Sequence, residues 1–392
     1  MIVRAPVSDQ MALTFNSSSP DNTSSSSVLS LCPTAITLFI LPSTYALLFL
    51  TALPGNALSL WVFQRCITSI SPTHVYLSHL SVSNLMSSLT MPFLAAYYAW
   101  GSAWPVSGAL CQLVLHVVTP NYFINMYVGL IILTLVALNR FASLIKHTHA
   151  SRPSTCTTLL PNRFFACLTR TAFAHRVCVA MWVVAVGGIV PGTVYYSMKE
   201  TAAGGEVDAE KGAGSGGEGV CYSPAVELGG ALSAVLNAPL ILLFFVFYLL
   251  VLLCYMTVLR HIRRSRRSSN IPTSHSQLGR VLRNIVVIQV VLSVCLLPYH
   301  ILKPVFVYLA HDQPMLAFST RPDTCHPLST IIELKSFFIL LAELRGATDP
   351  LMYFLLDNMF RSQTLRLFRC NKSDSGSRHA HCSVTGSVSQ NT

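Results

Sequence analysis

The chain has 392 residues, of which 52% are hydrophobic and only 10% are charged, and its formal net charge is +11. Soluble domains carry roughly 25% charged residues, so this composition excludes an ordinary soluble protein, a disordered chain and a coiled coil. A positive net charge is common in nucleic-acid-binding proteins, but those proteins gather their basic residues on one exposed face. The positions of the 26 Lys and Arg residues therefore decide what the charge means.

Seven apolar windows are long enough to cross a bilayer, which takes about 20 residues in a helix. They cover residues 35–63, 75–98, 110–144, 177–197, 228–259, 281–309 and 331–356. Each is expected to be a helix, because backbone amides in lipid need partners within their own segment. Residues 1–20 lack the apolar run of a cleaved signal peptide, so the first window is expected to direct insertion itself. The windows predict an all-α fold, a seven-transmembrane helix bundle formed by residues 35–356.

The Lys and Arg residues orient the bundle. Most of them lie in the inner segments if the N-terminus is outside, and this asymmetry follows the positive-inside rule. The outer segments hold only Arg4, Lys199, Lys211 and Arg321. We expect a plasma-membrane protein with an extracellular N-terminal tail over 1–34, which has glycosylation triplets at Asn16 and Asn22. Residues 357–370 are expected to form a short amphipathic eighth helix, and 371–392 a Ser-rich cytoplasmic tail.

Short motifs recur at defined positions within the windows. In chain order they are Gly55-Asn56, Leu80-Ser81-Val82-Ser83-Asn84-Leu85, Trp104-Pro105-Val106 before Cys111, Asn139-Arg140-Phe141, Trp182 and Pro191, Cys295-Leu296-Leu297-Pro298-Tyr299-His300, Asp349-Pro350-Leu351-Met352-Tyr353, and Phe360. Each motif alone is a weak signal. Their order and placement resemble the rhodopsin-like family of G-protein-coupled receptors, and the Pro-Tyr-His and Asp-Pro forms resemble its nucleotide- and lipid-receptor branch.

The chain also departs from that pattern. Asn84 stands where the family usually has an acid in the second helix, and Asn139 replaces the acid before the inner arginine. Leu296 replaces the aromatic residue before the sixth-window proline. These departures bear on activation, because they fall on positions that the resemblance links to switching.

The resemblance also implies covalent features. Cys111 and Cys221 would form the disulfide between the third helix and the second outer loop, in an oxidising compartment. Cys32 and Cys325 would form a second bridge, and the alternative is two free thiols. Cys370 follows the basic eighth helix and is a palmitoylation candidate, with a reduced thiol as the alternative.

The same resemblance assigns the G-protein switch. Its residues in this chain are Asn139, Arg140, Tyr255, Asp349, Pro350 and Tyr353. In the family the inner arginine meets the two tyrosines on activation, and opening of the sixth helix exposes a groove for a heterotrimeric G protein. With Asn139 in place of an acid, we expect a weaker inactive-state ion lock on Arg140 and raised basal activity. The structural alternative for Arg140 is an anchor that extends its charge to the membrane surface.

The seventh window contains the ionisable residues Glu343, Arg345 and Asp349. Such residues are expensive inside a membrane and are usually paired. Most relatives hold sodium here between two acids, but in this chain one acid is replaced and Gly129 supplies no hydroxyl. Because Arg345 and Asp349 are four residues apart, we predict that they pair and that the guanidinium replaces the ion; alternatively, Arg345 faces a neighbouring helix or water. The altered sodium-site region comprises Asn84, Asn125, Arg345 and Asp349.

Ligand recognition is expected in the outer half of the sixth and seventh windows. His300 and Lys303 are three residues apart and face the same way, and Lys335 adds a second cation. In nucleotide receptors of the branch this pattern contacts ligand phosphate, so the resemblance implies an anionic small molecule such as a nucleotide, lysophospholipid or fatty acid. Alternatively, Lys303 extends outward or pairs with Glu333. The predicted ligand contacts are Tyr122, His300, Lys303, Lys335 and Glu343.

The sequence as a whole predicts a receptor that activates a heterotrimeric G protein, with arrestin as a second candidate partner and membrane lipids around the helices. It has no phosphate-binding glycine loop, metal-spaced cluster or nucleophile constellation, so no enzyme, metal, cofactor or nucleic-acid partner is expected. A rival interpretation is a non-signalling or constitutively active scaffold or scavenger, which Asn84, Asn139 and Leu296 favour. A transporter or channel is a third class, but the sequence shows no internal repeat.

Overall fold

The structure is a computed structural model that describes residues 34–101, 117–149, 162–209, 231–268, 272–311 and 329–373. Every regular element in these segments is a helix. In the first half they are η1 (Ile36–Ile40), α1 (Leu41–Trp61), η2 (Val62–Cys66), α2 (Pro72–Ala99), α4 (Thr119–His149), α5 (Asn162–Leu168) and α6 (Thr171–Ala209). In the second half they are α8 (Ala231–Ser268), α9 (Pro272–Val291), η5 (Leu292–Leu296), α10 (Leu297–His311), α11 (Ser329–Leu356) and α12 (Asn358–Ser373).

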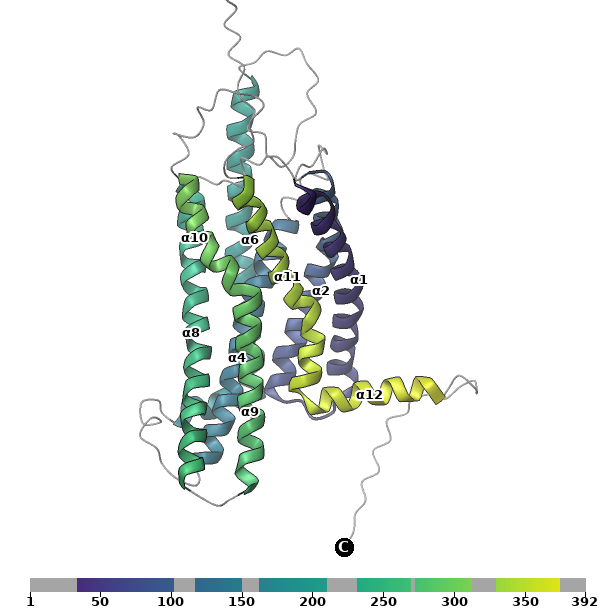
Figure 1. Ribbon diagram of the computed structural model, residues 1–392, viewed down its shortest axis with the longest axis vertical. Coiled ribbons are helices and arrows are strands. Elements are labelled where there is room, and N and C mark those ends of the chain that lie inside the picture. The colour runs from purple at the N-terminus through teal and green to yellow at the C-terminus, as the bar shows by residue number, and fades with distance from the viewer. Residues whose placement is uncertain are drawn as a thin grey trace, which may run out of the picture.

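The long helices run side by side, and α12 turns across one end of the bundle (Figure 1). A π-helical segment, η5, joins α9 to α10, so these three elements form one continuous span. The helix α4 is central, because it contacts α2, α5, α6, α8 and α9. This architecture confirms the predicted all-α bundle with a short eighth helix, in which Phe360 is buried and Arg361 is exposed.

Several helices extend beyond the apolar windows. The helix α2 begins at Pro72 because Ser71 caps it: the Ser71 hydroxyl accepts a bond from the His74 backbone, and the Ser71 backbone donates to the His74 ring. The helix α6 continues to Ala209, past the expected end at residue 197. Hydropathy marks only the part of a helix that meets lipid, so turns in water escape it.

Two of the long helices differ in polarity from the others. By length and composition alone, five helical stretches among the described residues are apolar enough to cross a membrane, and they belong to α1, α4, α6, α8 and the α9–α10 span. The helices α2 and α11 fall outside this set because serines and amides in α2, and charged residues in α11, make them less apolar, and many of these polar side chains are buried inside the bundle. Polar groups in membrane helices are stable on the inward face. The interface between α2 and α11 is therefore the place to look for a functional site.

Candidate functional site

The centre of the bundle contains a buried ion pair within α11. Arg345 Nη1 lies 3.4 Å from Asp349 Oδ2, and both side chains are inaccessible to solvent. The other terminal nitrogen, Nη2, donates to the backbone oxygen of Asn125 at 3.2 Å and to its side-chain oxygen at 3.4 Å. The guanidinium therefore pairs with Asp349 within α11, as predicted, and also joins α11 to α4.

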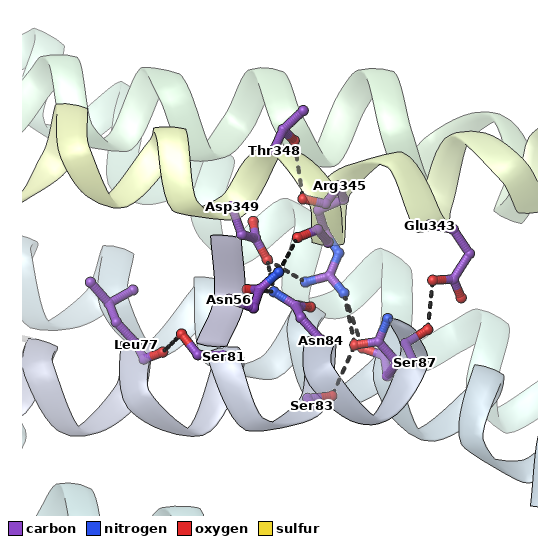
Figure 2. A network of polar contacts seen from close by, with 12 residues as sticks. Asn56, Leu77, Ser81, Ser83, Asn84, Ser87, Glu343, Arg345, Thr348 and Asp349 are labelled. Carbon is purple, nitrogen blue, oxygen red and sulfur yellow. Dashed lines mark hydrogen bonds and ion pairs between the residues drawn. The ribbon is translucent and has the colours of Figure 1, made fainter. Parts of the chain in front are cut away.

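Asn84 completes this cluster from α2. Its amide nitrogen donates to Asp349 Oδ2 at 2.8 Å and to Asn56 Oδ1 at 3.0 Å, and Asn56 in turn donates to the Gly346 carbonyl at 2.9 Å. Figure 2 shows Asn84, Arg345 and Asp349 converging between their helices. An amide at position 84 donates to the carboxylate directly, whereas a second buried carboxylate there would repel it. One acid, one guanidinium and two amides are thus joined by hydrogen bonds, while Asp349 Oδ1, Arg345 Nε and Asn84 Oδ1 are buried without a hydrogen-bond partner among the described residues.

Gly129 of α4 makes room for the guanidinium. A Cβ atom added to Gly129 would overlap the terminal nitrogens and central carbon of Arg345. The sequence pointed to Gly129 only because it lacks a hydroxyl; the space it leaves is the property that matters. Arg345 and Gly129 are therefore matched in shape, one large group filling the volume that the other leaves open.

Glu343, a predicted ligand residue, lies deep in the same region. Its Oε2 accepts a hydrogen bond from Ser87 of α2 at 2.6 Å, and the side chain is 2% exposed. Ser83, one turn earlier on α2, donates to Asn125 Oδ1 at 2.9 Å. Ser83 belongs to the second-window motif, whereas sequence reasoning missed Ser87. Ser87 bonds to Glu343, and Ser83 and Arg345 both bond to Asn125, so these polar contacts lie next to one another along α2, α4 and α11 (Figure 2).

His300 is buried in an aromatic cluster at the inner face of α10. Its ring stacks on Phe244 of α8 with centroids 3.8 Å apart, and Tyr127 and Tyr299 meet the ring edge-on. Its Nδ1 is bonded to the Leu296 carbonyl at 2.8 Å. Its Nε2 is buried and has no hydrogen-bond partner among the described residues. The ring is therefore fixed, with one polar atom left for a further contact.

Both predicted cations are buried beside aromatic rings. Lys303 Nζ lies 5.9 Å from the Tyr299 ring centroid, and Lys335 Nζ lies 4.7 Å from that of Phe306. Lys303 is 9% exposed and does not extend outward, contrary to one alternative weighed above. Tyr122, another predicted ligand contact, packs edge-on against Tyr299, with the two ring centroids 6.3 Å apart. The predicted ligand residues thus share one region of α4, α10 and α11.

Glu333, the alternative partner weighed for Lys303, bonds to the residues around η1. Its Oε1 accepts a hydrogen bond from Thr37 at 2.7 Å and another from Thr34. These bonds attach the first turn of α11 to η1. Glu333 therefore has a structural function, which is to hold the start of α11 against η1.

At the end of the bundle next to α12, Arg140 meets an acid that the sequence did not suggest. Arg140 Nη2 lies 3.7 Å from Asp357 Oδ2, and His74 Nε2 contacts the same oxygen at 3.0 Å. Burial raises the pKa of Asp357, but the His74 hydrogen bond, the Phe360 backbone N–H and the Arg140 charge outweigh burial and hold that pKa below its ordinary value. The carboxylate is therefore ionised at neutral pH.

The other predicted switch residues lie on α4, α8 and α11. Asn139 donates to the Leu168 carbonyl at 2.8 Å and accepts from Thr73 at 3.3 Å, so it joins α4 to α5 and α2. Tyr353 is buried against the rings of Phe63 and Phe360. Pro350 packs against the backbone of α1 at Gly55, and Tyr255 is partly buried at the edge of the core.

Several predicted features cannot be placed. Those that lie outside the described residues are Cys32, Cys111, Cys221, Cys325, Asn16 and Asn22. Cys370 falls within α12, but its side chain is outside the described part of that helix. The two disulfides, the glycosylation and the palmitoylation stay predictions.

Comparison with known proteins agrees with this geometry. Residues 55–353 match the family described as "7 transmembrane receptor (rhodopsin family)". The chain belongs to this family, and it is accordingly a multi-pass membrane receptor and not an enzyme.

Individual relatives refine the class. The chain is 33% identical over 344 residues to the human "Probable G-protein coupled receptor 82", covering 87% of this chain and 95% of that protein. It is 26% identical to the human "Uracil nucleotide/cysteinyl leukotriene receptor", covering 84% of this chain and 76% of that receptor. It is also 26% identical to a human purinoceptor, with 81% of this chain and 73% of that receptor covered. These similarities put the chain in the nucleotide- and lipid-receptor branch, as its motifs indicated.

Proposed function

We propose that this receptor lies in the plasma membrane with its N-terminus outside, binds a small anionic ligand between α10 and α11, and activates a heterotrimeric G protein at the opposite end. The observation that carries the proposal is the pair of buried lysines, Lys303 on α10 and Lys335 on α11. Phe306, over which the Lys335 ammonium lies, is three residues from Lys303 and shares its face of α10. Both cations therefore belong to one interface.

The chemistry of this interface favours a phosphate or carboxylate. An ammonium group binds phosphate and carboxylate oxygens through charge-assisted hydrogen bonds, and these bonds are stronger than neutral ones. Aromatic rings beside each lysine attract the cation and hold it in place. The buried Nε2 of His300 offers one neutral polar contact in the same region. A nucleotide, a lysophospholipid and a fatty acid all present such an anion.

The helix α11 connects the two ends of the receptor. From one end to the other it carries Lys335, Glu343, Arg345, Asp349 and Tyr353, all of them buried. A ligand that contacts Lys335 more strongly in one arrangement of the helices shifts the population toward that arrangement. Since α11 passes directly from this contact to the aromatic cluster of Tyr353, a small shift at its outer end reaches the G-protein end.

The proposal is tested by a screen of nucleotides, lysophospholipids and fatty acids for nucleotide exchange on purified G proteins. Lys303→Gln and Lys335→Gln are expected to lower the potency of an active compound about tenfold each, which corresponds to ~1.4 kcal/mol of binding free energy. Leu334→Ala is the matched control, because Leu334 adjoins Lys335 but is 41% exposed. Arg140→Ala should abolish exchange at any ligand concentration.

Two outcomes would contradict the proposal. If an active compound were equally potent on the wild type and on both lysine variants, the proposed anion site would be refuted. Binding of a ligand without nucleotide exchange on any G protein would instead favour the non-signalling scaffold or scavenger. Antibody access to an N-terminal tag on intact cells tests the orientation separately.

A further inference from the structure

The junction between α11 and α12 is built around Asp357. The residue is buried, although it lies at a helix end where carboxylates usually face water. Its Oδ1 accepts the Phe360 backbone N–H at 3.0 Å, which caps the first turn of α12. Its Oδ2 contacts His74 at the start of α2 and Arg140 near the end of α4. One carboxylate therefore connects α2, α4 and the α11–α12 junction.

We propose that Asp357 is the counterion that holds Arg140 in the inactive receptor, in place of the missing acid at position 139. The proposal rests on the proposed function, because it assigns the regulation of the same G-protein switch. Asn139 cannot provide this charge, and its amide is already bonded to the Leu168 carbonyl and the Thr73 hydroxyl. The lock has therefore moved from the neighbour of Arg140 to a different part of the chain.

The location of Asp357 links the lock to Tyr353. Tyr353, Phe63 and Phe360 form an aromatic cluster with centroids 5.0–5.9 Å apart, and the His74 ring lies 6.1 Å from Phe63. Asp357 is four residues after Tyr353, and its backbone N–H bonds to the Tyr353 carbonyl at 2.9 Å. Displacement of the α11 end would therefore disturb both the Arg140 contact and the cluster. The inferred device couples release of Arg140 to movement of α11.

His74 contributes by fixing the carboxylate. The His74 and Asp357 side chains are each 7% exposed, whereas that of Arg140 is 28% exposed. The His74 contact is thus shielded from water, and the longer Arg140 contact is partly screened. This asymmetry suits a switch: His74 keeps the carboxylate oriented while Arg140 retains enough access to leave it. His74 is accordingly a positioning residue for the lock.

Asp357→Asn removes the charge with the least change in shape, because the asparagine oxygen still accepts the Phe360 N–H as a cap. We expect basal nucleotide exchange on purified G protein to rise several-fold at equal receptor concentration, with the response to agonist retained. Asn358→Ala, at the adjacent exposed position, is the matched control and should leave basal exchange unchanged. Unchanged basal exchange in Asp357→Asn would overturn the proposal.

A compensating variant separates the lock from a merely structural effect. Asn139→Asp in the Asp357→Asn receptor restores an acid beside Arg140 and is expected to lower basal exchange again. A general loosening of the α11–α12 junction would not respond to an acid on α4. Persistently high basal exchange in the double variant would therefore count against the charge interpretation and overturn the proposal.

A signalling-independent readout distinguishes this proposal from the proposed function. Thermal unfolding of Asp357→Asn, Arg140→Gln and the double variant should give non-additive shifts in Tm. Non-additive shifts in a receptor that activates no G protein would refute the proposed function and still support the contact. Additive shifts would overturn the contact itself.

Discussion

The guanidinium of Arg345 occupies the space that a side chain on Gly129 would fill. The two residues belong to different helices, α11 and α4, and lie far apart in the sequence. A glycine inside a membrane-spanning helix usually allows two backbones to approach. Here it admits a charged side chain into the middle of the bundle, so the ion pair of Arg345 with Asp349 depends on this glycine.

Gly129→Ala is expected to destabilise the receptor. The added methyl group has to displace a guanidinium that is fixed by Asp349 and Asn125, and overpacking of this kind costs about 1–3 kcal/mol. The measurement is Tm of the purified receptor together with its surface level. Gly188→Ala in α6 is the matched control, since nothing lies within 4 Å of its added Cβ. A Tm for Gly129→Ala at or above that of Gly188→Ala would contradict the shape match.

Arg345 is also expected to make the receptor insensitive to sodium. The guanidinium already supplies Asp349 with a positive partner, so an added sodium ion has no charge to neutralise there. Agonist affinity and Tm should be equal in NaCl and in choline chloride at the same ionic strength. A strong sodium response of the wild type would show that the arginine does not replace the ion.

Removal of the Arg345 guanidinium is expected to make the receptor sensitive to sodium. Arg345→Ala leaves the Asp349 carboxylate buried, with the Asn84 amide as its hydrogen-bond donor, and breaking a buried pair in this way costs about 3–5 kcal/mol. Part of this loss should be recovered in NaCl but not in choline chloride, because a small cation can enter the vacated volume. Equal Tm in both salts would indicate that water or protonation of Asp349 compensates instead.

The parts of the site that depend on local spacing were predictable. The hydropathy pattern indicates the seven windows, although polar residues make α2 and α11 less apolar than the others. Arg345 and Asp349 are one helical turn apart, so their pairing follows from helix geometry. The clustering of Tyr122, His300 and Lys303 was accessible only through resemblance, since it joins α4 to α10. Local pattern thus determines which face of a helix a residue is on, but not which helix it meets.

The contact between Arg140 and Asp357 was not predictable for this reason. Asp357 follows the seventh window directly, as an ordinary polar residue after an apolar run, a position typical of a solvated helix cap. Its burial results from α12 folding back across the bundle end, next to His74 and Phe63. The expectation of a weakened lock on Arg140 considered only the adjacent position 139, and the structure supplies an acid from elsewhere.

His300 offers a test that separates packing from ligand recognition. His300→Phe keeps a planar ring stacked on Phe244 but loses the free Nε2 and the bond from Nδ1 to Leu296, so stability should fall by only about 1 kcal/mol. His300→Ala also loses the stacked ring and should cost about 3 kcal/mol or more. Agonist potency is expected to fall similarly in both variants, because both remove Nε2. Wild-type potency in His300→Phe would show that the ring serves packing alone.

The Asp357 carboxylate predicts how stability responds to acid. Its folded-state pKa lies below the ordinary value of 3.8, so the native receptor holds this proton less tightly than the unfolded chain. The stabilisation is therefore fully present above pH 3.8 and is lost as the pH falls through the depressed folded-state pKa. The difference in Tm between the wild type and Asp357→Asn should stay constant from neutral pH to mildly acidic pH and should shrink only below the ordinary value. A difference that vanished already near neutral pH would mean that Asp357 is protonated in the folded receptor, and it would remove the charge on which the contact with Arg140 depends.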